Sequence, residues 1–125
     1  IDAASARGYR PDCTVCADDL SAGARPGPWM ALQCVLDLAV GSVAHCVKVD
    51  DTVPGIEEGI NAGMWTVALS LSGSPAGMTL DEYRSASPDQ LAFRAAGAHF
   101  IIDTIAELPP VLDFIEMKLG NGVRP

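Results

Sequence analysis

The stretch that decides the fold is Val47-Lys48-Val49-Asp50-Asp51-Thr52-Val53-Pro54-Gly55-Ile56-Glu57-Glu58-Gly59. Its β-branched start, residues 47–49, predicts a short strand, because β-branched side chains suit a pleated sheet. Two adjacent carboxylates follow at once, and a break at Pro54 and Gly55 leads into a helix-like segment. In open α/β sheets, ligands bind at the carboxyl ends of parallel strands. We therefore expect the two acids to stand at the ligand-binding edge of a parallel sheet.

The acidic pair Asp50 and Asp51 admits two interpretations. Two neighbouring carboxylates are costly to bury in ionised form unless a cation lies beside them. A hard divalent cation such as Mg²⁺ takes oxygen ligands and would satisfy both acids. Alternatively, the pair forms a solvated turn, since Asp is common in turns. The residues of this stretch leave both interpretations open.

The composition indicates one globular domain over residues 1–125, with 49% hydrophobic residues to build a core. Eight basic against sixteen acidic residues give a net charge of −8 without a cluster of Lys or Arg, which argues against nucleic-acid binding. No apolar run approaches the roughly 20 residues that span a bilayer. The first residues lack the pattern of a signal peptide. We therefore expect a cytoplasmic protein without a membrane segment.

The four cysteines invite a metal or disulfide interpretation, which their positions do not favour. Cys13 and Cys16 have CxxC spacing, but they fall in a strand-like segment whose residues three apart point to opposite faces. No second CxxC or paired His motif completes a metal site. We expect Cys13, Cys16, Cys34 and Cys46 to be buried, reduced thiols.

Strand-like and helix-like segments alternate along the chain with short connections. This alternation predicts an α/β fold, a Rossmann-like parallel sheet flanked by helices and joined by right-handed crossovers. The nearly continuous apolar segment 64–70 predicts a strand buried on both faces, followed by a loop at 72–77. The expected strands are residues 13–17, 47–49, 64–70 and 100–102, and the expected helices are residues 29–40, 54–61, 90–96 and the segment that follows Pro109 and Pro110.

Other prominent side chains are interpreted as structural. The tryptophans are expected to pack in the core, the histidines to form local hydrogen bonds, and the paired glutamates to form a solvated helix face. These residues are Trp29, Trp65, His45, His99, Glu57 and Glu58.

Arg25 stands alone in a loop of small residues and prolines, just before a predicted helix. Its planar guanidinium suits phosphate oxygens, and Pro26 and Pro28 stiffen the backbone that presents it. The positive end of the following helix faces the same loop. An Arg from this loop and carboxylates from the next strand end would meet at one edge of the sheet. One could hold a phosphoryl group and the other its Mg²⁺, although a surface Arg beside a helix start is the plain alternative.

Four segments together resemble the phosphonoacetaldehyde hydrolase family (phosphonatases) of the haloacid dehalogenase-like superfamily. Residues 23–30, Gly-Ala-Arg-Pro-Gly-Pro-Trp-Met, resemble its motif III region, and residues 48–59 resemble its motif IV. Residues 61–67, Asn-Ala-Gly-Met-Trp-Thr-Val, and 97–100, Gly-Ala-His-Phe, also match family segments in order. The resemblance implies that residues 1–125 form the C-terminal half of the core domain, without the cap domain.

The resemblance implies hydrolysis of phosphonoacetaldehyde to acetaldehyde and phosphate by cleavage of a carbon–phosphorus bond. In the family, a cap Lys forms a Schiff base with the aldehyde, and an Asp nucleophile takes the phosphoryl group beside Mg²⁺. Carried over, Arg25 is the catalytic and phosphate-binding cation of motif III. Asp51 is the motif IV ligand of Mg²⁺, and Asp50 is a weaker second contributor. The family's full-length enzyme is also expected to be a homodimer.

Two departures accompany the resemblance. Some family members carry a further acid at the position of Gly55, for which Asp50 could compensate. The nucleophile, the motif II Ser or Thr and the cap Lys find no match here, and Lys48 does not match the cap Lys. We therefore expect the isolated chain to be inactive and to need the missing N-terminal core and cap segment.

Two alternatives remain at this point. A receiver-like phospho-acceptor domain fits the length, the alternation and the acidic residues Asp18, Asp19 and Asp51. It fits poorly at the last strand, where such domains place a Lys and this chain has Ile101-Ile102-Asp103. A non-catalytic relic or interaction module is the other alternative.

Overall fold

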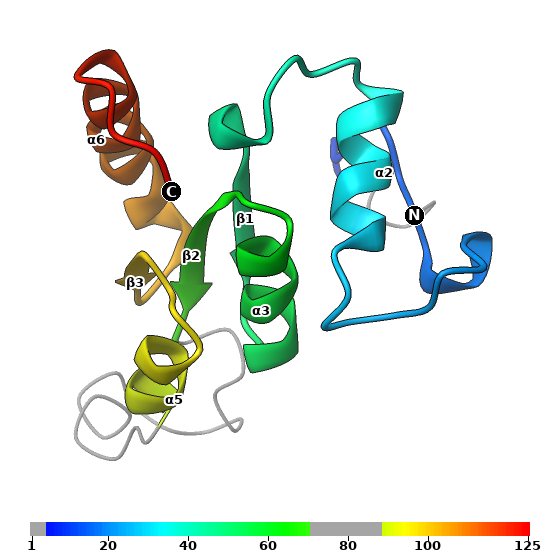
Figure 1. The fold of residues 1–125 in the computed structure, drawn as a ribbon, viewed down its shortest axis with the longest axis horizontal. Coiled ribbons are helices and arrows are strands. Elements are labelled where there is room, and N and C mark those ends of the chain that lie inside the picture. The colour runs from blue at the N-terminus through cyan, green and yellow to red at the C-terminus, as the bar shows by residue number, and fades with distance from the viewer. Residues whose placement is uncertain (1–4, 71–88) are drawn as a thin grey trace.

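The computed structural model describes residues 5–70 and 89–125, so the loop expected at 72–77 lies outside the described residues (Figure 1). In chain order the elements are the 3₁₀ helix η1 (Ala17–Asp19), α2 (Trp29–Asp37), η2 (Val43–His45), β1 (Val47–Asp50), α3 (Val53–Asn61), β2 (Trp65–Leu69), α5 (Asp89–Ala95), β3 (Phe100–Ile102), η3 (Ile105–Glu107) and α6 (Leu108–Gly120).

The described strands form one parallel sheet in the order β1-β2-β3. Val47 pairs with Trp65, and Val67 pairs with Phe100, which fixes the register on both sides of β2. The central strand is buried continuously from Trp65 to Ala68, as its apolar run predicts. The prediction of a parallel α/β sheet with flanking helices is therefore confirmed, and the carboxyl ends of its strands lie at one edge.

Helices α3 and α5 contact each other, and their apolar side chains form the core with the sheet. Ile56 and Ala68 are fully buried, and Phe93 is 4% exposed. Full burial of an aliphatic or aromatic side chain of this size stabilises the fold by about 1.5–3 kcal/mol. Helix α3 starts where expected, because the Thr52 hydroxyl accepts the Gly55 N–H at 3.2 Å and Pro54 occupies the first turn.

The prediction of a strand over residues 13–17 is wrong. Residues 13–16 have no regular structure, and residues 17–19 form η1. A strand is stabilised by the ladder that it forms with a neighbour, and no described strand pairs with this segment. The β-propensity of Cys-Thr-Val-Cys therefore does not produce a strand, because no described strand pairs with this segment.

Two predicted helix bounds also differ from the structure. Helix α2 ends at Asp37 rather than at residue 40, because Ala39 adopts a left-handed φ of 52° that ends the helical path. Helix α6 begins at Leu108, so Pro109 and Pro110 lie in its first turn instead of before it. Proline fits there because the first helical N–H groups have no partner within the helix.

The structure confirms some of the predictions for aromatic, cysteine and histidine residues and contradicts others. Trp65 is 5% exposed, but Trp29, expected in the core, is 45% exposed. The four cysteines are free, as expected, but none is fully buried: Cys16 is exposed, and Cys13, Cys34 and Cys46 are half-buried. His99 forms the local hydrogen bonds predicted for it, accepting the Thr66 N–H at Nδ1 over 3.0 Å. Within the described residues, no helix combines the length and apolar character needed to cross a membrane.

Candidate active site

Four charged side chains from three segments meet beside the carboxyl end of β1. Arg25 comes from the loop before α2, Lys48 and Asp50 from β1, and Glu58 from α3. We call these four residues the ion-pair cluster. Asp50 Oδ2 lies 3.3 Å from Arg25 Nη2 and 3.2 Å from Lys48 Nζ. Glu58 Oε2 lies 3.1 Å from Arg25 Nε and 2.8 Å from Lys48 Nζ, so each carboxylate contacts both cations.

The local structure explains how β1 and α3 supply this cluster. Residues two apart on a strand point to the same face, so Lys48 and Asp50 both face α3. Helix α3 can lie close because Gly59 carries no side chain: a Cβ there would lie 2.7 Å from the Lys48 Cβ. The small residue thus lets α3 bring Glu58 onto the strand.

Asp50 uses both of its carboxylate oxygens within the protein. Its Oδ1 accepts the Thr52 N–H at 3.0 Å and the Thr52 hydroxyl at 2.7 Å, while Oδ2 faces the two cations. Burial acts to raise the pKa of Asp50, but the Thr52 hydrogen bond and the charges of Lys48 and Arg25 outweigh it and lower that pKa. Asp50 is therefore held as a carboxylate.

Gly55 lies directly against this carboxylate. A Cβ at position 55 would overlap the carboxyl group of Asp50. The Asp50 side chain therefore occupies the space into which a side chain at position 55 would project, and only glycine fits beside it in this arrangement.

Glu58 is fully buried, so the expectation of a solvated face for the Glu57–Glu58 pair is wrong for Glu58. Besides the two cations at Oε2, its Oε1 accepts the Ala31 N–H at 3.1 Å. Ala31 lies in the first turn of α2, whose N-cap Pro28 makes no side-chain capping bond. Glu58 thus satisfies a helix N–H that has no partner within α2.

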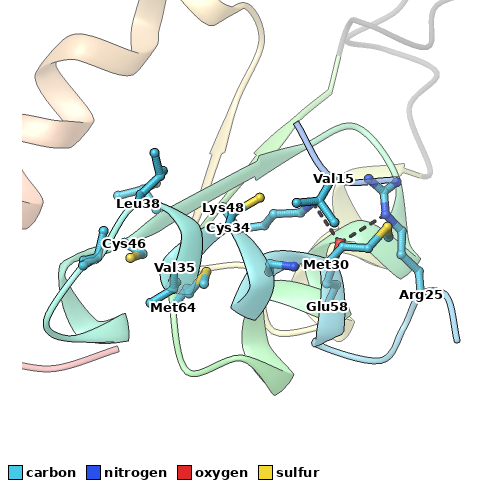
Figure 2. A pocket seen from close by; sticks show the side chains of 13 residues that line it. Val15, Arg25, Met30, Cys34, Val35, Leu38, Cys46, Lys48, Glu58 and Met64 are labelled. Atoms are coloured by element: carbon cyan, nitrogen blue, oxygen red, sulfur yellow. Dashed lines mark hydrogen bonds and ion pairs between the residues drawn. The ribbon is translucent and has the colours of Figure 1, made fainter. Parts of the chain in front are cut away.

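Arg25 is anchored on one side and open on the other. Its Nε and Nη2 contact the two carboxylates, whereas Nη1 makes no hydrogen bond to the described residues, and the side chain is 40% exposed. The Asn61 amide donates to the Pro26 carbonyl at 2.9 Å and holds the loop to α3. Figure 2 shows Arg25 and Lys48 on either side of the Glu58 carboxylate in this view.

Asp51 differs from Asp50, its neighbour in the chain. It is exposed and makes no hydrogen bond or ion pair within the described part of the chain. A free carboxylate suits a hard cation, so Asp51 fits a metal ligand, whereas Asp50 would have to give up a protein contact. No group of three or more potential metal ligands occurs among residues 5–70 and 89–125, so a metal ion at Asp51 would need further ligands from outside them.

A cavity of about 400 Å³ adjoins the cluster between α2 and β1 (Figure 2). Arg25, Lys48 and Glu58 form its polar end, and its remaining lining is mostly apolar, with Met30, Cys34, Val35, Leu38, Val47 and Met64 among it. Burial and a hydrogen bond with Cys13 raise the pKa of Cys34 to about 11. The thiol on this wall is therefore a poor nucleophile at neutral pH.

Two members of the cluster were not predicted as site residues. Lys48 is not predicted as a site residue because it does not match the cap Lys. Its spacing of two residues from Asp50 on a strand nevertheless indicates that both side chains share a face. Glu58 lies 33 residues from Arg25, and no local pattern predicts that contact. The predicted residues Arg25 and Asp50 are brought into direct contact, and Asp51 directly follows Asp50 in the chain.

The fold defines the structural class of the chain. A conserved haloacid dehalogenase-like protein from Agrobacterium tumefaciens matches 79% of this chain and 40% of its own, with 23% identity and a TM-score of 0.63, which shows the shared fold. The chain therefore has the α/β fold of haloacid dehalogenase-like cores. No family model matches the sequence.

Sequence comparison shows similarity to one group of proteins within this class. Phosphonoacetaldehyde hydrolases from Salmonella typhimurium and Klebsiella pneumoniae are each 52% identical to the whole of this chain. A phosphonoacetaldehyde hydrolase-like protein from Oleispira antarctica matches 99% of the chain with 44% identity and a TM-score of 0.82. The chain is homologous over its whole length to the phosphonoacetaldehyde hydrolases. It spans about half the length of these relatives, 50% of the two hydrolases and 48% of the solved structure.

Proposed function

We propose that this chain is the C-terminal core half of a Mg²⁺-dependent hydrolase that cleaves phosphonoacetaldehyde to acetaldehyde and phosphate. The observation that carries the proposal is the 52% identity over the entire chain, together with Arg25 held by two carboxylates yet 40% exposed. In phosphoryl transfer, positioning and charge neutralisation provide most of the catalysis. Arg25 has the geometry that both of these tasks require.

Arg25 would bind the phosphoryl group of the substrate. Its Nε and Nη2 are fixed by Glu58 and Asp50, so the guanidinium plane is set before the ligand arrives. The Nη1 group remains available to donate to phosphoryl oxygens. Because the protein already fixes the orientation of the guanidinium, little conformational entropy is lost when a phosphoryl group binds.

Asp51 would hold the Mg²⁺ ion, which supplies positive charge next to the phosphoryl oxygens when bound. Its exposed carboxylate at the edge of the sheet supports this role. Asp50 as a second contributor would have to exchange its contact with Thr52 or with the cations for the metal. Asp50 acts on the site mainly through Arg25 in this proposal.

The rest of the relatives' length would supply the nucleophilic Asp and the Schiff-base Lys that the family resemblance implies. Lys48 is not suited to the second role, because its Nζ is held between Asp50 and Glu58 at 3.2 and 2.8 Å. The apolar cavity beside β1 supports a further segment packing there. Cytoplasmic location and a homodimer are part of the same proposal.

The receiver-like alternative is less favoured. The neighbour with a TM-score of 0.82 is a phosphonoacetaldehyde hydrolase-like protein, and the last strand carries Ile101-Ile102-Asp103 where a receiver has its Lys. A relic without catalysis would not require an anchored and accessible Arg25.

Steady-state kinetics on the whole protein that contains this chain test the proposal. We expect Arg25→Ala to lower kcat/KM for phosphonoacetaldehyde by about 10³-fold or more, as loss of a charge-stabilising Arg does in phosphoryl transfer. Asp51→Asn should raise the Mg²⁺ concentration needed for half-maximal rate. Arg94→Ala, at an exposed Arg on α5, is the matched control. Near-normal kinetics for Arg25→Ala, or sustained turnover by residues 1–125 alone, would contradict the proposal.

A further inference from the structure

Helix α3 holds the loop that carries Arg25 at several points, and Glu58 makes most of these contacts. Its carboxylate accepts from Arg25 Nε at 3.1 Å, from Lys48 Nζ at 2.8 Å and from the Ala31 N–H at 3.1 Å. Asn61, three residues on and therefore on the same face of α3, donates to the Pro26 carbonyl at 2.9 Å. The loop and the first turn of α2 are thus tied to α3 at Arg25 itself and at two points after it, Pro26 and Ala31.

We propose that Glu58 is the positioning residue for Arg25, fixing the guanidinium and the start of α2 so that Nη1 faces an incoming phosphoryl group. This inference rests on the proposed function of Arg25 and extends it to a residue that does not touch the ligand. Glu58 has no exposed surface, so its carboxylate acts through Arg25 and not on the substrate.

The chemistry of the contacts requires a carboxylate at position 58. Two cations share Oε2, and a backbone N–H uses Oε1, so all three groups donate and both oxygens accept. A glutamine side chain has only one acceptor oxygen. Whichever way its amide is turned, its NH₂ group must face either the Ala31 N–H or the two cations. Glu58→Gln therefore keeps the size of the side chain but releases one anchor of the loop.

Asp50 does not replace Glu58 in this role. Asp50 contacts Nη2 at the far edge of the guanidinium, whereas Glu58 contacts Nε, next to the aliphatic part of the side chain. Two contacts on different nitrogens define the plane of the guanidinium, and one contact leaves it free to swing. Loss of Glu58 thus broadens the orientations of Arg25 without removing its charge.

The first test uses the Nε–Hε signal of Arg25 in the NMR spectrum of the whole protein, with Glu57→Gln as the matched control. Glu57 is adjacent in sequence and makes no hydrogen bond or ion pair in the described part of the chain. We expect Nε–Hε exchange with solvent to be about tenfold faster or more in Glu58→Gln and unchanged in Glu57→Gln. Rapid exchange in the unmodified protein, or equal exchange in the two variants, would overturn the inference.

The second test is a double-mutant cycle with inorganic phosphate as the ligand, measured by calorimetry. Glu58→Gln should weaken phosphate binding about tenfold or more in the Arg25 background and have little effect in the Arg25→Ala background, because it acts through Arg25. A merely structural role would give the same factor in both backgrounds and would overturn the inference. Glu58→Asp, which retains the charge on a shorter side chain, should restore part of the affinity.

The two proposals can fail separately. If phosphate binding shows this coupling but the protein does not hydrolyse phosphonoacetaldehyde, the positioning role stands and the proposed substrate is wrong. If the protein hydrolyses phosphonoacetaldehyde and Glu58→Gln behaves like Glu57→Gln, the function stands and the positioning role is wrong. A protein that binds no phosphate at all overturns both.

Discussion

Helices α2 and α3 have the same length of nine residues but opposite environments. The sequence of α2, WMALQCVLD, is the more apolar, yet none of its residues is buried, and Leu36 is 71% exposed. Helix α3, VPGIEEGIN, buries Gly55, Ile56, Glu58 and Gly59 against the sheet. Burial in this chain therefore follows the neighbours that a helix finds, and two glycines and a glutamate are buried because α3 lies on β1 and β2.

The largest expected difference between the two helices is in stability. Ile56→Ala on α3 leaves a cavity in the core and should lower the free energy of unfolding by about 2–5 kcal/mol. Leu36→Ala on α2 removes a side chain that is 71% exposed and should change it by about 0.5 kcal/mol or less. Urea denaturation monitored by circular dichroism measures both. Equal losses would show that another part of the protein covers α2 as closely as the sheet covers α3.

A second comparison sets a glycine of α3 against the glycine that follows α2. A Cβ at Gly55 overlaps the Asp50 carboxylate, so Gly55→Ala should cost about 1–3 kcal/mol of stability and displace Asp50 from Arg25. Gly41 has open space around its Cβ position and no left-handed φ, so Gly41→Ala is the control and should be nearly neutral. The urea midpoints of the two variants should differ. Matching midpoints would mean that Asp50 adopts another rotamer at no cost.

A smaller effect is expected from the histidine beside the strand that α3 covers. Burial lowers the pKa of His99 below its usual value of 6.5, and its Nδ1 must be unprotonated to accept the Thr66 N–H. The unfolded chain therefore binds more protons, so this contribution is complete above about pH 6.5 and is lost as the pH falls towards the folded pKa.

The urea concentration at the unfolding midpoint should accordingly decrease as the pH is lowered from about 7.5 to about 5.5. His99→Gln should make that decrease smaller. His45→Gln, at an exposed histidine, serves as the control and should leave the slope unchanged. A slope that persists in His99→Gln would assign the titration to other groups.

The smallest expected effect is on the reactivity of two cysteine thiols and not on stability. Cys34 of α2 lines the cavity and has a pKa raised to about 11, whereas Cys16 is exposed. Since the thiolate is the nucleophile, iodoacetamide at about pH 8 should modify Cys34 at least about tenfold more slowly than Cys16. Peptide mass spectrometry over time gives both rates. Comparable rates would show that the Cys34 thiol is as accessible and as reactive as the exposed Cys16 thiol.

The sequence predicts those parts of the fold that depend on local pattern. Alternating segments predict the parallel sheet, the apolar run at β2 predicts its central position, and Thr52 with Pro54 predicts the start of α3. The resemblance to the phosphonoacetaldehyde hydrolases is confirmed by 52% identity over the whole chain.

What the sequence did not predict depends on contacts between distant residues. The strand expected at 13–17 needs a neighbour that the described residues do not contain. Glu58 looks like one of two surface glutamates until Arg25 and Ala31, 33 and 27 residues away, are placed beside it. Trp29 looks like a core residue until α2 is found to bury none of its side chains. In each case the decisive partner is distant in the chain.

The charge balance of the ion-pair cluster bears on how fast an anion can arrive. Two cations face two carboxylates, so the cluster is formally neutral, while the whole chain carries −8. At low ionic strength, where the Debye length is long, an approaching anion therefore meets the net negative field of the chain before it can contact Arg25. Moderate salt screens that repulsion and should therefore speed the encounter of an anion with this chain, the reverse of electrostatic steering.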